Sequence, residues 1–383
     1  MIGPFTIDTY LPSFPAIARD FAVGALEMQQ TLAVYLLCFA VMTLFHGTLS
    51  DSFGRRPVIL AGLCIFSLAS VGCALAQDFG QLLLFRGVQG LSAGVGMVVG
   101  RAIIRDSFEG HEAQRLMALV TMIFGLAPAI APVIGGWLQS GFGWRAVFVF
   151  LALYGVLLLA ACAWRLPETL PARQPFALAP LAGNYLRLGT NRRLLLLSSA
   201  VAFNFSGFFI YIVSAPALIY DLLGLRETQF AWLFVPGISG VMSGAFLSGR
   251  LAGRVAPRRT VGIGYAVMSG ATAFNLGYSG FFDPALPWTV LPVMCYTFGM
   301  ALAMPSITLI ALDLFPQNRG MTSSLLGFQH SFFTAVTAGV ISPLLSHAAL
   351  TLALGMAALL ASGWLSWRVY LHMETKASPH ARA

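Results

Sequence analysis

The chain has 383 residues, of which 58% are hydrophobic and only 9% are charged, whereas a soluble domain has roughly 45–50% apolar and about 25% charged residues. This composition excludes a cytosolic enzyme, a disordered chain and a nucleic-acid-binding protein with a basic face. The net charge of +8 comes mainly from arginines in short gaps between apolar runs, which is typical of a membrane protein with basic cytoplasmic loops.

The apolar runs predict an all-α integral membrane protein with twelve transmembrane helices, because about 20 residues of helix cross the ~30 Å hydrocarbon core. The predicted helices cover residues 1–17, 28–48, 58–77, 80–103, 114–138, 144–165, 194–216, 229–249, 260–281, 287–311, 321–346 and 348–371. Only the gap 166–193 is long, and it is rich in proline and arginine. It predicts a cytoplasmic linker between two six-helix bundles, residues 1–165 and 194–383.

The basic residues predict the orientation of the chain. Only Arg19, Arg145 and Arg226 fall in the loops of one side, whereas nearly all the others of the 22 basic residues fall on the other side or in the linker and tail. Because basic loops stay in the cytoplasm, both termini are expected there, in the inner membrane of a bacterium.

The first run contains Asp8, which is the only acid placed well inside a span. Only seven residues precede it, which is about 10 Å of helix, and the segment does not look like a signal peptide. We therefore expect the first helix to lack its inner half, through a misassigned start or a truncation. Pro12 leaves the carbonyl of Asp8 without its helical partner, as in the broken helices of transport sites.

The gap between the second and third runs contains Gly47, Asp51, Gly54, Arg55 and Arg56 in the pattern G-x-L-x-D-x-x-G-R-[KR]. Here the chain resembles the major facilitator superfamily, whose best-known loop signature has this pattern. The resemblance implies a two-bundle transporter with a gating loop at this position. Asp51 is expected near the positive start of the third helix.

The gating loop is expected to pair with a basic residue, and the second half of the chain contains a corresponding loop. Arg101 or Arg105, at the inner end of the fourth helix, could pair with Asp51 and hold the inner side closed. The corresponding loop of the second half, 249–259, has Gly253 where the acid would stand. Any charge latch is therefore expected to be asymmetric between the halves.

Two further runs resemble motifs of the superfamily, and the antiporter-like one implies export. The fifth run resembles the antiporter signature G-x-x-x-G-P-x-x-G-G, and the fourth resembles the family's R-x-x-Q-G motif through Arg86 and Gln89, which share one helix face. The positions of the antiporter motif are Pro128, Ala131, Pro132, Gly135 and Gly136. A kinked packing helix and a snorkelling arginine are the structural alternatives.

The first run, with P-x-x-I-D-x-Y-L-P, also resembles the Bcr/CflA group of bacterial drug:proton antiporters. This resemblance implies that Asp8 carries the proton, with Arg86 lowering its pKa and burial raising it. The expected substrates are small amphipathic drugs, and the expected driving force is a proton gradient with no cofactor.

Other polar residues in the apolar runs are candidates for the substrate cavity. They are Tyr35, Gln89, Asn204, Tyr211, Gln329 and His330. His330 has the alternative of a hydrogen-bonded core residue. No cysteine or histidine spacing predicts a metal site.

The expected protein is therefore a monomeric multidrug exporter in a lipid bilayer, with no nucleic-acid partner. A metabolite transporter of the same fold, for an amino acid or a sugar, is the alternative. The sequence lacks the clustered catalytic residues that a membrane enzyme would need. A passive channel would not need the loop motif or the intramembrane acid.

Overall fold

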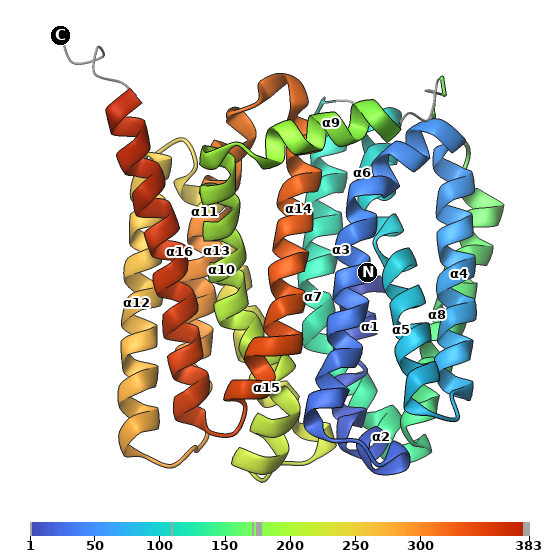
Figure 1. The fold of residues 1–383 in the computed structure, drawn as a ribbon, viewed down its shortest axis with the longest axis vertical. Coiled ribbons are helices and arrows are strands. Elements are labelled where there is room, and N and C mark those ends of the chain that lie inside the picture. The colour runs from blue at the N-terminus through green and yellow to red at the C-terminus, as the bar shows by residue number, and fades with distance from the viewer. Residues whose placement is uncertain (1, 109, 171, 174–177, 378–383) are drawn as a thin grey trace.

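The structure is a computed structural model that describes residues 2–108, 110–170, 172–173 and 178–377. Within these residues every regular element is helical, and the long helices stand side by side as one bundle (Figure 1). The longest uninterrupted helices are α3 (Ala25–Phe53), α4 (Arg55–Leu75), α7 (Gly110–Phe142), α8 (Trp144–Arg165), α10 (Arg192–Val213), α11 (Ala231–Leu251), α12 (Pro257–Phe281), α13 (Leu291–Asp313) and α16 (Ala349–Ala377).

Among the described residues, 10 helical segments are long and apolar enough to cross a membrane. Two of the twelve predicted spans are not among them. The first run is divided into α1 (Ile2–Asp8), η1 (Leu11–Ser13) and α2 (Phe14–Phe21). Helix α12 has 25 residues, but its Gly, Ser, Thr and Asn residues make it less apolar. The count of twelve therefore remains a prediction.

Two further predicted spans contain a break. The fourth is formed by α5 (Phe79–Ala93) and α6 (Val95–Ser107), which meet at Gly94. The eleventh is formed by α14 (Arg319–Val336), a π-helical turn η5 (Thr337–Ile341) and α15 (Ser342–Leu345). Shorter turns follow α10 and α13, namely η2 (Ala217–Leu222), η3 (Glu227–Gln229) and η4 (Pro316–Asn318).

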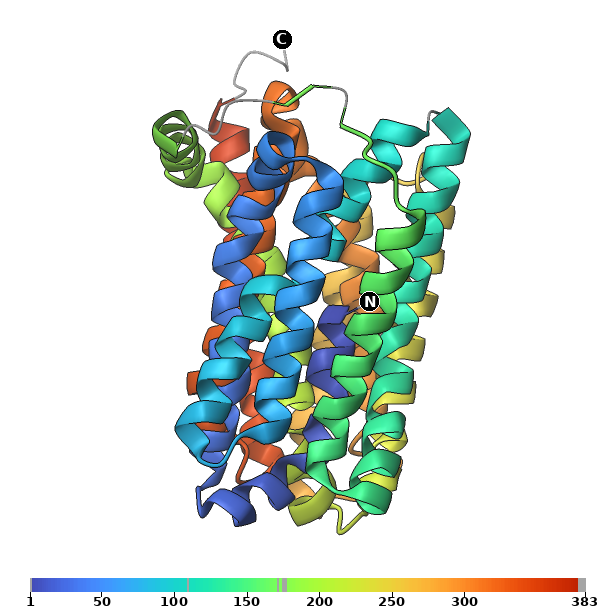
Figure 2. The same ribbon diagram turned by 90° about the vertical axis from the view of Figure 1, so that its right-hand side faces the viewer.

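The predicted linker contains one further helix, α9 (Leu178–Gly189), which lies across one end of the bundle (Figure 1). The Tyr185 hydroxyl of α9 donates to the carbonyl oxygen of Leu44 in α3, at 3.1 Å. We call this end of the bundle the linker end. The opposite end is called the α2 end, and α1 begins at mid-height between the two (Figure 2).

The helices before and after α9 are called here the N-terminal half (residues 2–165) and the C-terminal half (residues 192–377). The N-terminal half packs chiefly through α4 on α8 and α3 on α5, and the C-terminal half through α12 on α13 and α10 on α16. The halves meet where α3 packs on α14 and where α7 packs on α11. Residues between the halves are therefore contributed mainly by α3, α7, α11 and α14.

Candidate functional site

The break in the first segment places Asp8 inside the protein. Helix α1 ends at this residue, and Pro12 follows in η1, so the expected break at the proline is present. Only 4% of the Asp8 surface is exposed. A buried carboxylate costs free energy unless it is paired or protonated, and no described basic side chain forms an ion pair with Asp8.

Arg86 in α5 is completely buried, which excludes a snorkelling arginine. Its Nη1 donates to the Thr6 carbonyl oxygen at 3.3 Å and to Gln89 Oε1 at 2.9 Å. The Gln89 amide in turn donates to the Ser70 hydroxyl at 2.8 Å. The expected shared face of Arg86 and Gln89 is therefore confirmed, and these two side chains link α5 to α1 and to α4.

Two aromatic rings complete the surroundings of Arg86. Its guanidinium carbon lies 4.6 Å from the ring centroids of both Tyr10 and Tyr35, which is a favourable distance for a cation–π contact. Asp8 lies two residues after Thr6, at the end of α1. We call this group the Arg86 cluster; it consists of Thr6, Asp8, Tyr10, Tyr35, Ser70, Arg86 and Gln89.

The Arg86 cluster contains unused hydrogen-bonding capacity. The Nε and Nη2 groups of Arg86 have no hydrogen-bond partner although both are buried. A buried donor without a partner costs free energy. These groups therefore favour transient binding of an anion or of another hydrogen-bond acceptor. Asp8 belongs to the same cluster, but the structure contains no Asp8–Arg86 ion pair.

Small residues bring α5 close to α3 and so bring Tyr35 close to Arg86. A Cβ atom at Gly90 would overlap the Tyr35 carbonyl group, and one at Gly87 would lie 3.2 Å from the Val34 side chain. Such close helix approach is the usual role of small residues in membrane helices.

The antiporter-like motif lies in α7, which contains both Pro128 and Pro132. A Cβ atom at Gly135 would overlap the Thr9 carbonyl, and one at Gly136 would overlap the Glu227 carbonyl in η3. Ala131, between the prolines and glycines, is buried. The motif therefore holds α7 against the broken first segment and, at the same time, against the C-terminal half.

At the linker end, the gating-loop motif forms a network around Arg55. Its guanidinium group forms ion pairs with Asp51 and, at 2.9 Å, with Asp106 at the end of α6. It also donates to the Ser50 hydroxyl at 2.7 Å. The neighbouring Arg56 donates to the Ala163 carbonyl oxygen at 2.8 Å. The loop thus joins the ends of α3, α4, α6 and α8.

The pairing of Asp51 with Arg101 or Arg105 is not what the structure contains, because Arg55 lies one turn from Asp51 and reaches it first. Arg101 and Arg105 instead line a cavity of about 350 Å³ at the linker end. Gly47 and Asp51 line the same cavity, which lies between α3, α6 and α14. The four residues thus face one space without forming the expected pair.

The expected position of Asp51 at the start of the third helix was also wrong, because Asp51 lies in the last turn of α3. The carboxylate at the start of α4 belongs to Glu168, which accepts hydrogen bonds from the backbone N–H groups of Arg55 and Arg56 at 2.9 and 3.3 Å. Gly54, just before them, has a φ of 103°, a conformation that favours glycine.

The pKa of Glu168 reflects this capping role. Burial alone would raise its pKa, but the backbone N–H groups of Leu170, Arg55, Arg56 and Thr169 together hold it below its ordinary value. These donors stabilise the ionised carboxylate. In the C-terminal half, the corresponding loop has no acid of its own, and Arg258 pairs with Glu374 of α16 at 2.6 Å.

The remaining substrate candidates lie in the C-terminal half. The Asn204 amide donates to the Tyr265 hydroxyl at 2.9 Å, and the Asn275 amide donates to the Tyr211 hydroxyl at 2.6 Å. These bonds join α10 to α12, and both Asn204 and Tyr211 are buried. They therefore lie within the C-terminal half and do not line the linker-end cavity.

Gln329 and His330 are half-buried on α14, facing α10. Gln329 accepts a hydrogen bond from the Ser198 hydroxyl and donates to the Ser199 hydroxyl at 2.9 Å. The His330 ring lies 4.3 Å from the Phe205 ring, between centroids. These two residues are the partly accessible members of the predicted substrate set in this half.

Several residues that hold these sites together were not singled out from the sequence. Thr6 acts through its backbone and Ser70 is one of many serines in apolar helices, so neither has a sequence signal. Asp106 did have a sequence signal, because the pair Arg105–Asp106 at the end of the fourth span matches the Bcr/CflA group, but its pairing with Arg55 was not expected. Glu168 lies in the linker, 113 residues from Arg55, and only the fold brings them together.

Comparison with known proteins places this arrangement in a family. The family model described as Major Facilitator Superfamily matches residues 1–339, so the chain belongs to that superfamily of membrane transporters. The protein is accordingly a transporter and not an enzyme.

Curated relatives narrow the group within the superfamily. The chain is 32% identical over 350 residues to the "Uncharacterized MFS-type transporter YdgK" of Bacillus subtilis, covering 90% of this chain and 85% of the relative. It is 30% identical to the "Bicyclomycin resistance protein homolog" of Haemophilus influenzae, covering 85% and 82%. It is 29% identical to "Multidrug resistance protein D" of Escherichia coli, covering 88% and 85%. These relatives confirm the resemblance to the Bcr/CflA group.

Solved structures support the fold alone. The chain is similar to a bacterial homologue of the human lysosomal transporter Spinster in its inward-facing, unoccupied conformation, with a TM-score of 0.70 and 18% identity, over 96% of this chain and 94% of that chain. The occupied form of the homologue gives a TM-score of 0.72 at 19% identity, over 98% and 94%.

Proposed function

We propose that this transporter exports small amphipathic drugs across the bacterial inner membrane in exchange for protons. The observation that carries this proposal is the Arg86 cluster, in which a buried acid without an ion-pair partner lies in the same group as a buried arginine with two unused donors. A buried acid of this kind favours the protonated state and releases its proton when an arginine or water reaches it.

In the proposed cycle, Asp8 takes a proton from the outer side and releases it to the inner side. When Asp8 is ionised, the free Nε and Nη2 groups of Arg86 are the natural hydrogen-bond donors for its carboxylate. When Asp8 is protonated, that attraction is lost and the break after α1 is free to change its contacts. Because α7 packs on Thr9 through Gly135, such a change reaches the interface between the halves.

The proton gradient supplies enough free energy for concentrative export. One inward proton provides about 2.3 kcal/mol per 100 mV and ~1.4 kcal/mol per pH unit. Together these permit roughly a hundredfold drug gradient or more. The proposal requires no bound cofactor.

The proposal also includes the topology of the chain, the gating of its inner side and its oligomeric state. The chain spans the membrane twelve times as two six-helix bundles, 1–165 and 194–383, with both termini and the linker in the cytoplasm. The linker end then faces the cytoplasm and the α2 end faces outwards. The Arg55 network closes the inner side when the outer side opens, and the protein acts as a monomer. Gln329 and His330, the partly accessible candidates, contact the drug between the halves, whereas the buried Tyr35 and Gln89 belong to the proton site.

The experiment that tests the proposal is expression in a bacterial strain that lacks its own drug efflux pumps. We expect increased resistance to several amphipathic drugs, and drug accumulation by inside-out vesicles that stops when a protonophore collapses the gradient. Accumulation of amino acids or sugars, with no drug resistance, would contradict the proposal.

A further inference from the structure

The linker-end cavity has an excess of positive charge. Among the described residues that line it, Arg55, Arg101 and Arg105 are basic and Asp51 is the only acid, which gives a formal charge of +2. Asp51 already forms an ion pair with Arg55. The charges of Arg101 and Arg105 are therefore not balanced within the cavity.

Arg101 and Arg105 lie on one face of α6. They are four residues apart, so the two side chains are neighbours on the helix surface. Both residues are exposed, and no described acid forms an ion pair with either of them. Like charges at this spacing repel each other, so an anion bound near both would relieve the repulsion and gain two charged partners.

The rest of the lining combines apolar and hydroxyl side chains. Leu44, Met97 and Met321 are apolar, and Thr48 and Ser323 carry hydroxyl groups. The volume of about 350 Å³ lies in the range of sites that hold small organic ligands. The cavity therefore suits a ligand with an anionic head and a short apolar body.

The chemistry of the two arginines selects the head group. Guanidinium groups bind carboxylates through charge-assisted hydrogen bonds from several N–H donors. Cations would be repelled from this cavity, and neutral compounds would gain no ion pair. We propose that the linker-end cavity binds the carboxylate head of amphipathic anions. This site is separate from the Arg86 cluster, none of whose residues lines the cavity.

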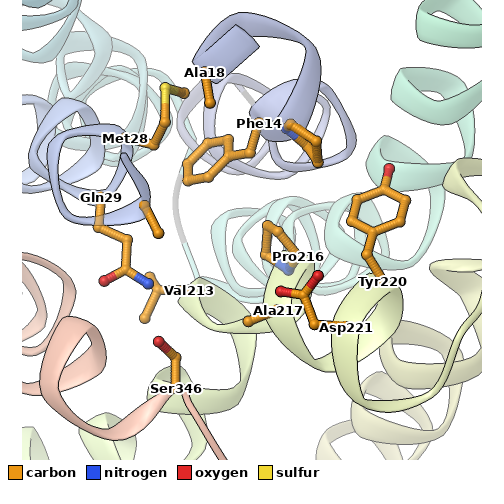
Figure 3. A pocket seen from close by; sticks show the side chains of 12 residues that line it. Phe14, Ala18, Met28, Gln29, Val213, Pro216, Ala217, Tyr220, Asp221 and Ser346 are labelled. Carbon is orange, nitrogen blue, oxygen red and sulfur yellow. The ribbon is translucent and has the colours of Figure 1, made fainter. Parts of the chain in front are cut away.

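A smaller cavity at the α2 end has the opposite charge. It has a volume of about 200 Å³ and lies between α2 and α3 on one side and α10 and η2 on the other (Figure 3). Asp221 is the only charged side chain among its described lining residues. A carboxylate would therefore be attracted to the linker end and repelled at the α2 end.

The consequence for transport rests on the proposed export function. The linker end is the proposed cytoplasmic end, and the cavity lies between the halves, because α3 and α6 line it from one half and α14 from the other. It would therefore hold an anionic drug by its carboxylate at the start of export. Arg101 and Arg105 would then set a preference for anions, separately from proton coupling at Asp8.

Binding to the purified full chain in phosphatidylcholine nanodiscs tests the site directly. The probe is 4-phenylbutyrate, and its neutral counterpart is 4-phenylbutanamide, which has an amide in place of the carboxylate. We expect Arg101→Gln and Arg105→Gln each to weaken 4-phenylbutyrate binding by about tenfold and to leave 4-phenylbutanamide binding unchanged. Arg101→Lys should lose less affinity than Arg101→Gln, because it keeps the charge.

The matched control is Arg192→Gln. Arg192 is an exposed arginine at the start of α10, three residues after α9, and it does not line the cavity. This variant should bind 4-phenylbutyrate as the wild type does. Wild-type affinity in both Arg101→Gln and Arg105→Gln would overturn the proposal, as would an equal loss in Arg192→Gln. Thermal unfolding of each variant identifies losses caused by misfolding, for which Arg101→Lys is the second test.

Nanodiscs that also contain phosphatidylglycerol distinguish a transported anion from an acidic lipid headgroup. We expect 4-phenylbutyrate to bind in them as it does in phosphatidylcholine alone. Loss of binding in these nanodiscs would mean that a lipid headgroup occupies the cavity, and it would overturn the proposal.

An export assay separates this site from the transport function as a whole. In inside-out vesicles, Arg101→Gln should lower the ratio of nalidixate uptake to chloramphenicol uptake by about tenfold, because only nalidixate carries a carboxylate. An unchanged ratio would overturn the anion-selective role. If the wild type transports neither compound, the proposed function fails, and the binding experiment alone then decides the site.

Discussion

The backbone of Gly135 in α7 packs directly against the carbonyl group of Thr9, the residue that follows Asp8. There is no room for a side chain between them. The next residue, Gly136, packs as closely against Glu227 of the C-terminal half. One turn of α7 therefore connects the segment that contains the buried acid to the other half of the protein.

We predict that Gly135→Ala disrupts this connection. The added methyl group overlaps main-chain atoms that cannot rotate away, and overpacking of this kind costs about 1–3 kcal/mol. Thermal unfolding should occur at a lower temperature and drug efflux should fall. Gly141→Ala is the control, because a Cβ there meets nothing within 4 Å. Identical behaviour of the two variants would refute the role of this contact.

A second prediction concerns the Arg55 network. Asp106→Asn removes a charged partner of Arg55 at 2.9 Å, which should weaken the packing of the linker ends of α3, α4 and α6 by about 1–3 kcal/mol, the scale of hydrogen bonds to charged groups. A cysteine introduced at Thr48, which lines the linker-end cavity, should react faster with a thiol reagent when the native cysteines are replaced. Drug turnover should slow while drug binding stays near normal.

The matched variant for this experiment is Asp313→Asn. Asp313 also pairs with an arginine, Arg319 at 2.8 Å, but both side chains are more than half exposed, and exposed pairs contribute little. Thiol reactivity that is unchanged by Asp106→Asn, or raised equally by Asp313→Asn, would mean that the network does not hold these helix ends together.

The capping carboxylate of α4 predicts a pH dependence of stability. Because the pKa of Glu168 lies below its ordinary value of 4.5, the ionised group stabilises the fold above about pH 4.5, and this contribution is lost as the pH falls through the folded-state pKa. Glu168→Gln should therefore unfold at a lower temperature than wild type near pH 7, and the two should converge once the pH has fallen below the folded-state pKa of Glu168. A constant difference between the two proteins across this range would contradict the capping role.

Sequence patterns predicted the helices and the family well, because membrane helices need long apolar runs and the loop motif is specific. They also predicted the break near Pro12, since proline removes a backbone hydrogen bond whatever surrounds it. The partners of Asp51 were not predictable in the same way. Arg55 and Arg101 have the same charge, and only the path of the chain decides which one is near.

The same limit applies to Arg86. Its burial and its bond to Gln89 follow from their spacing on one helix face. Its other contacts come from the first segment, through Thr6 and Tyr10, and from Tyr35 of α3. The sequence does not place these elements relative to α5. Asn204 and Tyr211 illustrate the reverse case, because a polar residue in a membrane helix can satisfy its hydrogen bonds with a neighbouring helix just as well as with a substrate.

A fourth prediction concerns Arg86→Lys, which keeps the charge but loses the planar guanidinium group. Lysine cannot reproduce the bonds to Thr6 and Gln89 together with the contacts to both tyrosine rings. We expect a loss of about 1–3 kcal/mol in stability and slow, proton-dependent efflux. The comparison is Arg226→Lys, at an exposed arginine. Wild-type efflux and stability in Arg86→Lys would mean that only the charge matters.

The central claim is that Asp8 carries the proton, and Asp8→Asn in reconstituted vesicles tests it most directly. Asparagine keeps the size and polarity of the side chain but cannot bind and release a proton. Drug uptake is measured with an imposed pH gradient and, separately, as drug exchange without a gradient. We predict that the variant exchanges drug but gains no acceleration from the gradient, whereas the wild type does. Gradient-driven uptake by Asp8→Asn at the wild-type rate would contradict the account.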